Sequence, residues 1–249
     1  MCAIGLSLCI KKKKMNIKNK LLLTKSTISY NLKIVFANKF VYFLIAALAF
    51  YLMVTGIMLF SDGNPEEDDI FSTLIFPGIL IIFYPVLFNI QNDKDSRMLE
   101  IIFGIPNYRY KVYLVRFIIS LGVLFVLLLL MAWFSHFSVV PVSVFSMVYQ
   151  LMYPLVFLAC LSFLFSTLLK NGRGAAVVMV IIGLVFFILA EPLEHNKWNI
   201  FLNPFNVPSD MSHSIWMNIV YQNRLILVVG SIISLLWTMI NLQKRESFV

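Results

Sequence analysis

The chain has 249 residues, of which 60% are hydrophobic and only 13% are charged, and its mean hydropathy is +0.88. Soluble domains contain about 25% charged residues, so this composition excludes an ordinary water-soluble fold. The net charge of +8 could indicate a nucleic-acid partner, but the basic residues lie beside apolar runs. That arrangement predicts contact with anionic lipid headgroups. We therefore expect an all-α polytopic protein of the lipid bilayer, with no nucleic-acid partner.

Residues 1–39 form a basic segment that precedes the first long apolar run. Four lysines follow the apolar residues 1–10, whereas a secretory signal peptide has its charges in front, so we expect no signal peptide. The true start is either Met1 or Met15. Apolar residues recur at helical spacing between lysines over 15–38, which predicts an amphipathic helix at the membrane interface, with a disordered basic tail as the alternative.

Six stretches are long and apolar enough to cross a hydrocarbon core of about 30 Å, which needs roughly 20 helical residues. The predicted spans are 40–60, 70–90, 112–134, 144–169, 174–193 and 224–242. They form a six-helix domain over 40–242, followed by a tail over 243–249. We expect no charged residue deep in any span, which argues against proton relays and ion-coupled pumping.

The orientation follows from the distribution of basic residues, because cytoplasmic loops retain Lys and Arg. Of the 20 such residues, only Lys197 and Arg224 lie on one side of the predicted bundle, and that side also holds the acidic run at 62–69. Both termini, the 91–116 connection and the 170–173 turn are therefore expected in the cytoplasm. The protein is predicted to be a multi-pass component of a bacterial inner membrane.

Catalytic, metal-binding and cofactor-binding patterns are missing from the sequence. His136, His195 and His213 lie in separate connections without HExxH or paired-cysteine context, and the three cysteines have no CxxC spacing. No glycine is followed by lysine, so a GxxxxGK[ST] phosphate loop is absent. We expect no catalytic residue, metal or cofactor in this chain, and no ATP hydrolysis by it alone.

The connection between the second and third predicted spans reads QNDKDSRMLEIIFGIPNYRYKVYLVRF over 91–117. Its charges alternate in sign, and apolar residues then follow at helical spacing until Gly104 and Pro106. This predicts a short amphipathic helix parallel to the membrane.

This connection resembles the corresponding segment of the ABC-2 transporter permease family. That segment has an acid, a base and an acid, any one residue, then Gly-Thr-Leu-Glu, two or three apolar residues, a proline, a basic residue and another basic residue near the next span. Arg97 and Met98 stand where Gly and Thr are usual. The residues that match are Asp93, Lys94, Asp95, Leu99, Glu100, Pro106, Arg109 and Arg116.

The resemblance implies a permease subunit that forms the path of an ATP-driven exporter. It implies a homodimer, or a heterodimer with a sister permease, on two copies of a separate ATPase that binds ATP and Mg²⁺. The helix after the second span would then be a coupling helix that docks in the ATPase. The expected coupling interface consists of Asp93, Asp95, Arg97, Glu100, Pro106 and Arg109.

Residues 194–223 fit another feature of the family, in which the connection before the last span forms short helices that dip into the membrane. NPFNVP at 203–208 would be the break between two such helices.

Three alternatives remain open at this point. The charged connection could be an ordinary inner loop of an unrelated membrane protein. The chain could be a noncatalytic anchoring or immunity subunit, or a polytopic enzyme that modifies lipids. The identity of any transported substrate does not follow from the sequence.

Overall fold

The computed structural model describes residues 40–60, 65–98, 101–102, 104, 108–209 and 211–243, and this part of the chain is helical with no β-strand. A π-helix, η1, leads directly into α6. The elements are α2 (Phe40–Phe60), α3 (Glu67–Leu87), α4 (Asn89–Asp95), η1 (Arg109–Leu114), α6 (Val115–Ser138), α7 (Val144–Leu169), α8 (Gly172–Ala190) and α9 (His213–Asn241). The predicted interfacial helix within 1–39 lies outside the described residues.

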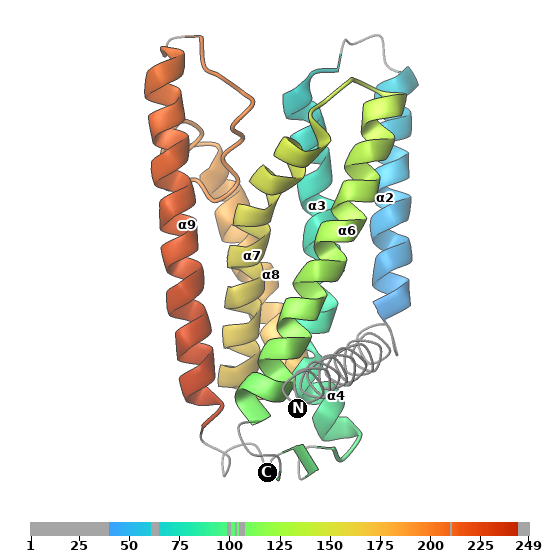
Figure 1. Ribbon diagram of the computed structural model, residues 1–249, viewed down its shortest axis with the longest axis vertical. Helices are drawn as coiled ribbons and strands as arrows, with labels where there is room; N and C mark the ends of the chain where they lie inside the picture. The colour runs from blue at the N-terminus through green and yellow to red at the C-terminus, as the bar shows by residue number, and fades with distance from the viewer. Residues whose placement is uncertain are drawn as a thin grey trace, which may run out of the picture.

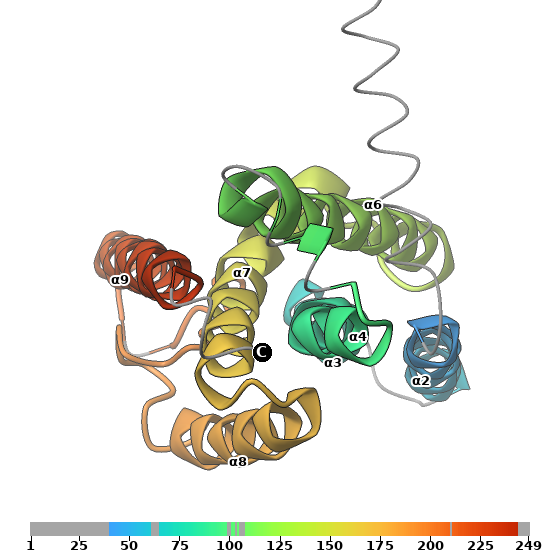
Figure 2. The same ribbon diagram turned by 90° about the horizontal axis from the view of Figure 1, so that it is seen from below.

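The long helices run side by side along the longest axis of the molecule (Figure 1). Helix α7 is central and packs against α3, α6, α8 and α9, while α2 packs mainly against α3. The end-on view shows α6 and α9 on either side of α7, with α2 and α8 at the margins (Figure 2).

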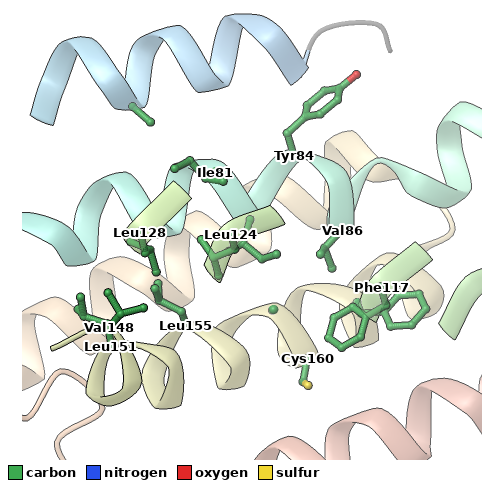
Figure 3. Packing of buried hydrophobic residues seen from close by; sticks show 14 of the residues in the cluster. Ile81, Tyr84, Val86, Phe117, Leu124, Leu128, Val148, Leu151, Leu155 and Cys160 are labelled. Atoms are coloured by element: carbon green, nitrogen blue, oxygen red, sulfur yellow. The ribbon is translucent and has the colours of Figure 1, made fainter. Parts of the chain in front are cut away.

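The core lies between α3, α6 and α7, where Figure 3 shows leucines from α6 and α7 directed toward one another. Leu124, Leu128, Leu151 and Leu155 are fully buried. A Cβ atom on Gly78 would lie 2.6 Å from Leu155 Cδ1, so a larger residue at this close approach of α3 and α7 would require Leu155 to shift. Lipid tails are as apolar as leucine, so close van der Waals packing stabilises such a contact in a membrane.

The outward faces of the bundle are apolar. Helix α8 buries only Gly172, Ala175 and Met179, whereas Phe187 is 73% exposed. In the described part of the chain, six helices are long and apolar enough to cross a membrane. Large exposed apolar faces are incompatible with water but suit lipid. The chain is therefore a multi-pass integral membrane protein.

The two ends of the bundle differ in charge. The acidic end begins α3, where Glu66 and Asp69 form a reciprocal capping box, with the Glu66 amide donating to Asp69 Oδ2 at 3.0 Å. Carboxylates at a helix N-terminus are stabilised by the helix dipole. The acidic end holds Glu66, Glu67, Asp68 and Asp69, and the opposite, basic end holds Lys94, Arg97, Lys111, Lys170 and Arg173.

Each predicted span corresponds to a helix. Predicted spans 40–60 and 144–169 coincide with α2 and α7, and the second, third and fifth differ from the helices by a few residues. Helix α9 begins at His213, before the start predicted for the sixth span, so Arg224 lies inside the helix. The two short helices expected in 194–223 are also not seen, since the described residues of 191–209 form turns and 213–223 belong to α9.

Candidate functional site

The charged connection at the basic end begins as a continuation of the second membrane-spanning helix. The chain bends at Phe88, whose φ of −92° and ψ of 1° separate α3 from α4. The Asn92 amide still donates to the Phe88 carbonyl at 2.8 Å, so helical hydrogen bonding resumes at once. Helix α4 therefore projects beyond the bundle but remains attached to α3 (Figure 1).

A buried ion pair joins α4 to the start of α6. Arg116 Nη1 donates to Asp93 Oδ2 at 2.7 Å and Oδ1 at 2.9 Å, and to Asn89 Oδ1 at 3.0 Å. The Asp93 and Arg116 residues are 6% and 5% exposed. Removing one partner of such a pair leaves an uncompensated buried charge, so the pair acts as a rigid connection between α4 and the third span.

The pair is incompletely satisfied on its Arg116 side. The Arg116 Nε atom is buried and has no hydrogen-bond partner. Tyr113 of η1 is fully buried and its hydroxyl interacts with the Asp93 carboxylate. The π-helix, which frequently occurs at functional sites, thus contributes a residue to this network.

Helix α4 also contacts the turn between α7 and α8. Gln91 Oε1 accepts from the Arg173 amide at 3.2 Å. A Cβ on Gly172 would lie 2.8 Å from Gln91 Oε1 and 2.9 Å from Phe88 Cδ1, so a larger residue would require these side chains to shift. Helix α4 is thereby connected to the fifth span as well as to the third.

Helix α4 ends in a Schellman motif. The Arg97 amide donates to the Lys94 carbonyl at 3.0 Å, and the Met98 amide donates to the Asp93 carbonyl at 2.9 Å. Arg97 itself is left-handed, with φ of 55°. Glycine is the usual residue at this position because a Cβ is unfavourable there. The same position is the one where the ABC-2 pattern carries glycine.

The exposed surface around α4 is polar. Lys94, Asp95 and Arg97 are exposed, and Ile101 is 66% exposed whereas Ile102 is 4% exposed. A hollow of about 310 Å³ is lined by Gln91, Lys94, Asp95, Lys170, Asn171 and Arg173. Charged side chains of both signs are thus available at this end of the bundle.

The end of the connection is fastened to α9. Arg109 Nη1 donates to the Met239 carbonyl at 3.1 Å, and the Tyr108 hydroxyl donates to the Leu242 carbonyl. The last carbonyls of a helix have no partner within the helix, and a basic side chain there also complements the helix dipole. Both ends of the connection are therefore held by other spans.

The structure separates the predicted interface residues into two groups. Asp95 and Arg97 are exposed, whereas Asp93 pairs with Arg116 and Arg109 binds the end of α9. Glu100 and Pro106 lie outside the described residues. The prediction did not assign Arg116 a partner. A lone arginine where an apolar helix begins, downstream of an acid, was the available indication of this pair.

A second polar cluster surrounds Arg224, which lies inside α9. Arg224 is 6% exposed. Its Nε donates to Gln150 Oε1 at 3.0 Å, Nη1 to Asn223 Oδ1 at 2.9 Å and Nη2 to the Leu202 carbonyl at 3.1 Å. Neutral oxygens from three parts of the chain thus surround the guanidinium and allow α9 to continue through it.

The described residues contain no group of three His, Cys, Asp or Glu side chains that could hold a metal ion. His136 Nδ1 lies 2.8 Å from the Val142 carbonyl, and His195 contacts the Trp216 ring edge-on.

Comparisons of the chain with protein-family models, with curated proteins and with solved structures found no match.

Proposed function

We propose that this chain is the permease subunit of an ATP-driven ABC-2 type exporter and that the α4 segment receives the movement of a separate ATPase. The observation that carries the proposal is the combination of exposed charges at the end of α4 with the buried Asp93–Arg116 pair at its base. A segment that docks a partner needs exposed polar groups, and one that transmits movement needs a rigid connection to the spans.

The left-handed conformation of Arg97 supports this proposal independently of the charges. A family pattern with glycine at this position is explained if the helix there ends in the same Schellman motif. Arginine in place of the usual glycine then changes the side chain at position 97 but leaves the backbone turn the same. The unusual Arg97 adds an exposed positive charge where the ATPase would bind.

The proposed mechanism requires no nucleotide chemistry in this chain. ATP brings two ATPase subunits together. Each ATPase subunit contacts α4 and thereby moves α4 relative to the membrane. The Asp93–Arg116 pair passes this displacement to α6, and the Gln91–Arg173 contact passes it to α8. A ligand shifts a conformational equilibrium only through different contacts in the two states, and α4 supplies such contacts.

The complete transporter would contain two such permeases, either identical or a pair with a sister chain, and two ATPase copies. The basic end faces the cytoplasm, since Lys and Arg are retained on that side. Both termini are then cytoplasmic, and the setting is the inner membrane of a bacterium. The ATPase supplies the ATP and Mg²⁺ sites.

Photo-cross-linking in native membranes tests the docking claim. A photoreactive amino acid is placed at Asp95 or at Arg97, and at Glu66 of the acidic end as the control, because all three are exposed. We expect positions 95 and 97, but not 66, to capture a protein with a Walker A motif, identified by mass spectrometry. Failure of both positions to capture any ATP-hydrolysing protein would contradict the proposal.

A charge reversal separates an exporter from the rival functions. In the reconstituted complex, Asp95→Arg should lower transport-coupled ATPase activity several-fold, whereas Glu194→Arg, at an exposed acid in the connection between α8 and α9, should not. An anchoring or immunity subunit would bind the ATPase without coupled transport. A lipid-modifying enzyme would show turnover by the isolated chain, without any ATPase.

A further inference from the structure

A long apolar groove runs along α7 between α6 and α9. Helix α7 packs against both neighbours and forms the floor. Figure 3 shows the Cys160 sulfur pointing from α7 toward α9. The groove has a volume of about 590 Å³ and no charged residue, and its lining includes Phe117, Leu121, Met152, Val156, Cys160 and Leu235. Ligand pockets in proteins commonly have volumes of about 300–1,000 Å³.

The groove opens toward the membrane. Ile118 of α6 and Ile232 of α9 both line it, and they are 57% and 53% exposed. Its surroundings are the apolar outer faces of the two helices. A molecule that enters from the side therefore comes from the lipid phase and not from water.

A second hollow of about 390 Å³ continues the groove toward the acidic end. The two share Tyr153 and Val228, so they form one continuous site, here called the α6–α7–α9 groove. Most of the second hollow is lined by apolar residues, but Gln150 and Arg224 also line it. The guanidinium carbon of Arg224 lies 5.5 Å from the centre of the Tyr153 ring, at the junction of the two parts.

Arg224 carries a positive charge that the protein does not neutralise. Its three hydrogen bonds go to neutral oxygens, and it has no carboxylate partner among the described residues. A guanidinium has five N–H donors, so two remain available for another acceptor. A buried charge without a counter-charge is unfavourable, and an anion bound in the hollow would relieve that cost.

The depth of Arg224 matches that of a lipid headgroup. From Arg224 to Asn241 the helix rises about 26 Å, at 1.5 Å per residue, which is close to the hydrocarbon thickness of about 30 Å. Arg224 is therefore at the boundary between tails and headgroups on the acidic side. The apolar part of the groove extends from there toward the membrane interior, where an acyl chain lies.

We propose that the α6–α7–α9 groove binds a net-anionic glycerophospholipid, with its phosphate at Arg224 and one acyl chain along α7. Arginine binds phosphate oxygens through paired N–H groups, and Tyr153 provides a ring beside the same position. This inference does not depend on the transport function, since it rests on the groove and on the uncompensated charge.

Native mass spectrometry of the purified full chain tests the proposal. The protein is mixed with equal amounts of phosphatidylglycerol and phosphatidylcholine that carry the same acyl chains. We expect retention of phosphatidylglycerol over phosphatidylcholine on the order of tenfold, as a charge-assisted contact provides. Equal retention of the two lipids would overturn the proposal.

Three variants locate the bound lipid. Arg224→Gln should abolish the preference for phosphatidylglycerol, and Val228→Trp should reduce retention of both lipids because it fills the groove. Leu236→Trp is the control, since Leu236 is also exposed on α9, at 59% against 43% for Val228, but does not line the groove. If Arg224→Gln does not fold, the two tryptophan variants decide whether lipid occupies the groove: Val228→Trp should reduce lipid retention and Leu236→Trp should not.

Other occupants predict different results. If inorganic phosphate alone competes with lipid and Val228→Trp has no effect, the site is a simple anion site and the lipid proposal is wrong. If a second copy of the chain or another protein occupies the groove in place of lipid, Val228→Trp changes the oligomeric state without changing lipid retention. That result would also overturn the proposal.

Discussion

The Asp93–Arg116 pair allows the sharpest test of how α4 is held. Asp93→Leu leaves the Arg116 guanidinium with only Asn89 as a polar partner, and Arg116→Leu leaves the Asp93 carboxylate without its cation. The side chains of the pair are 6% and 8% exposed, so water cannot replace either partner. We expect each single substitution to lower the free energy of unfolding by about 3–5 kcal/mol.

The double variant with leucine at both positions should recover most of that loss. Replacing a buried ion pair by apolar residues of similar volume is often neutral or stabilising, by about 1–4 kcal/mol. The free energy of unfolding is measured in detergent by circular dichroism during denaturant titration. Strictly additive losses in the double variant, or single losses below about 1 kcal/mol, would refute the view that the buried charges are coupled.

Three further predictions concern the turn, the core and the topology. Arg97→Gly should stabilise the protein by about 1 kcal/mol in the same titration, because glycine adopts the left-handed backbone without the steric cost of a Cβ; no gain in stability would contradict the view that Arg97 is strained. Gly78→Ala should destabilise it by about 1–3 kcal/mol through overpacking against Leu155, while Gly56→Ala, with nothing within 4 Å, should be neutral or stabilising; equal effects would contradict the close approach. A reporter fused after residue 249 should report cytoplasm and one inserted in the 61–69 loop should report the exterior; the reverse result would overturn the orientation.

The candidate site was predictable only in part. The position of a charged helix after the second span could be read from alternating signs in 93–100, because the pattern is contiguous in sequence. The pairing of Asp93 with Arg116 could not, since the two are 23 residues apart and meet only when α3, α4 and α6 pack. Thus Asp93 matched the docking pattern, but its carboxylate is directed into the protein.

Arg224 illustrates the same limit for the sixth span. An arginine within an apolar stretch is read as the edge of a span because a charge in hydrocarbon is costly. The structure adds that Arg224 lies inside α9 and is buried against Gln150, which is 74 residues away, and against the carbonyl of Leu202. Helix α9 therefore continues to His213, and the connection before it is shorter than expected.

The sequence by itself determined the membrane class, the number of spans and the contrast between a basic and an acidic end. These properties depend on the length and composition of contiguous segments, because each segment must match the thickness and polarity of the bilayer by itself. Only the tertiary structure decided which charges are buried and which are exposed. The free energy of a buried charge depends on partners brought from other helices, as Asp93 is for Arg116 and Gln150 is for Arg224.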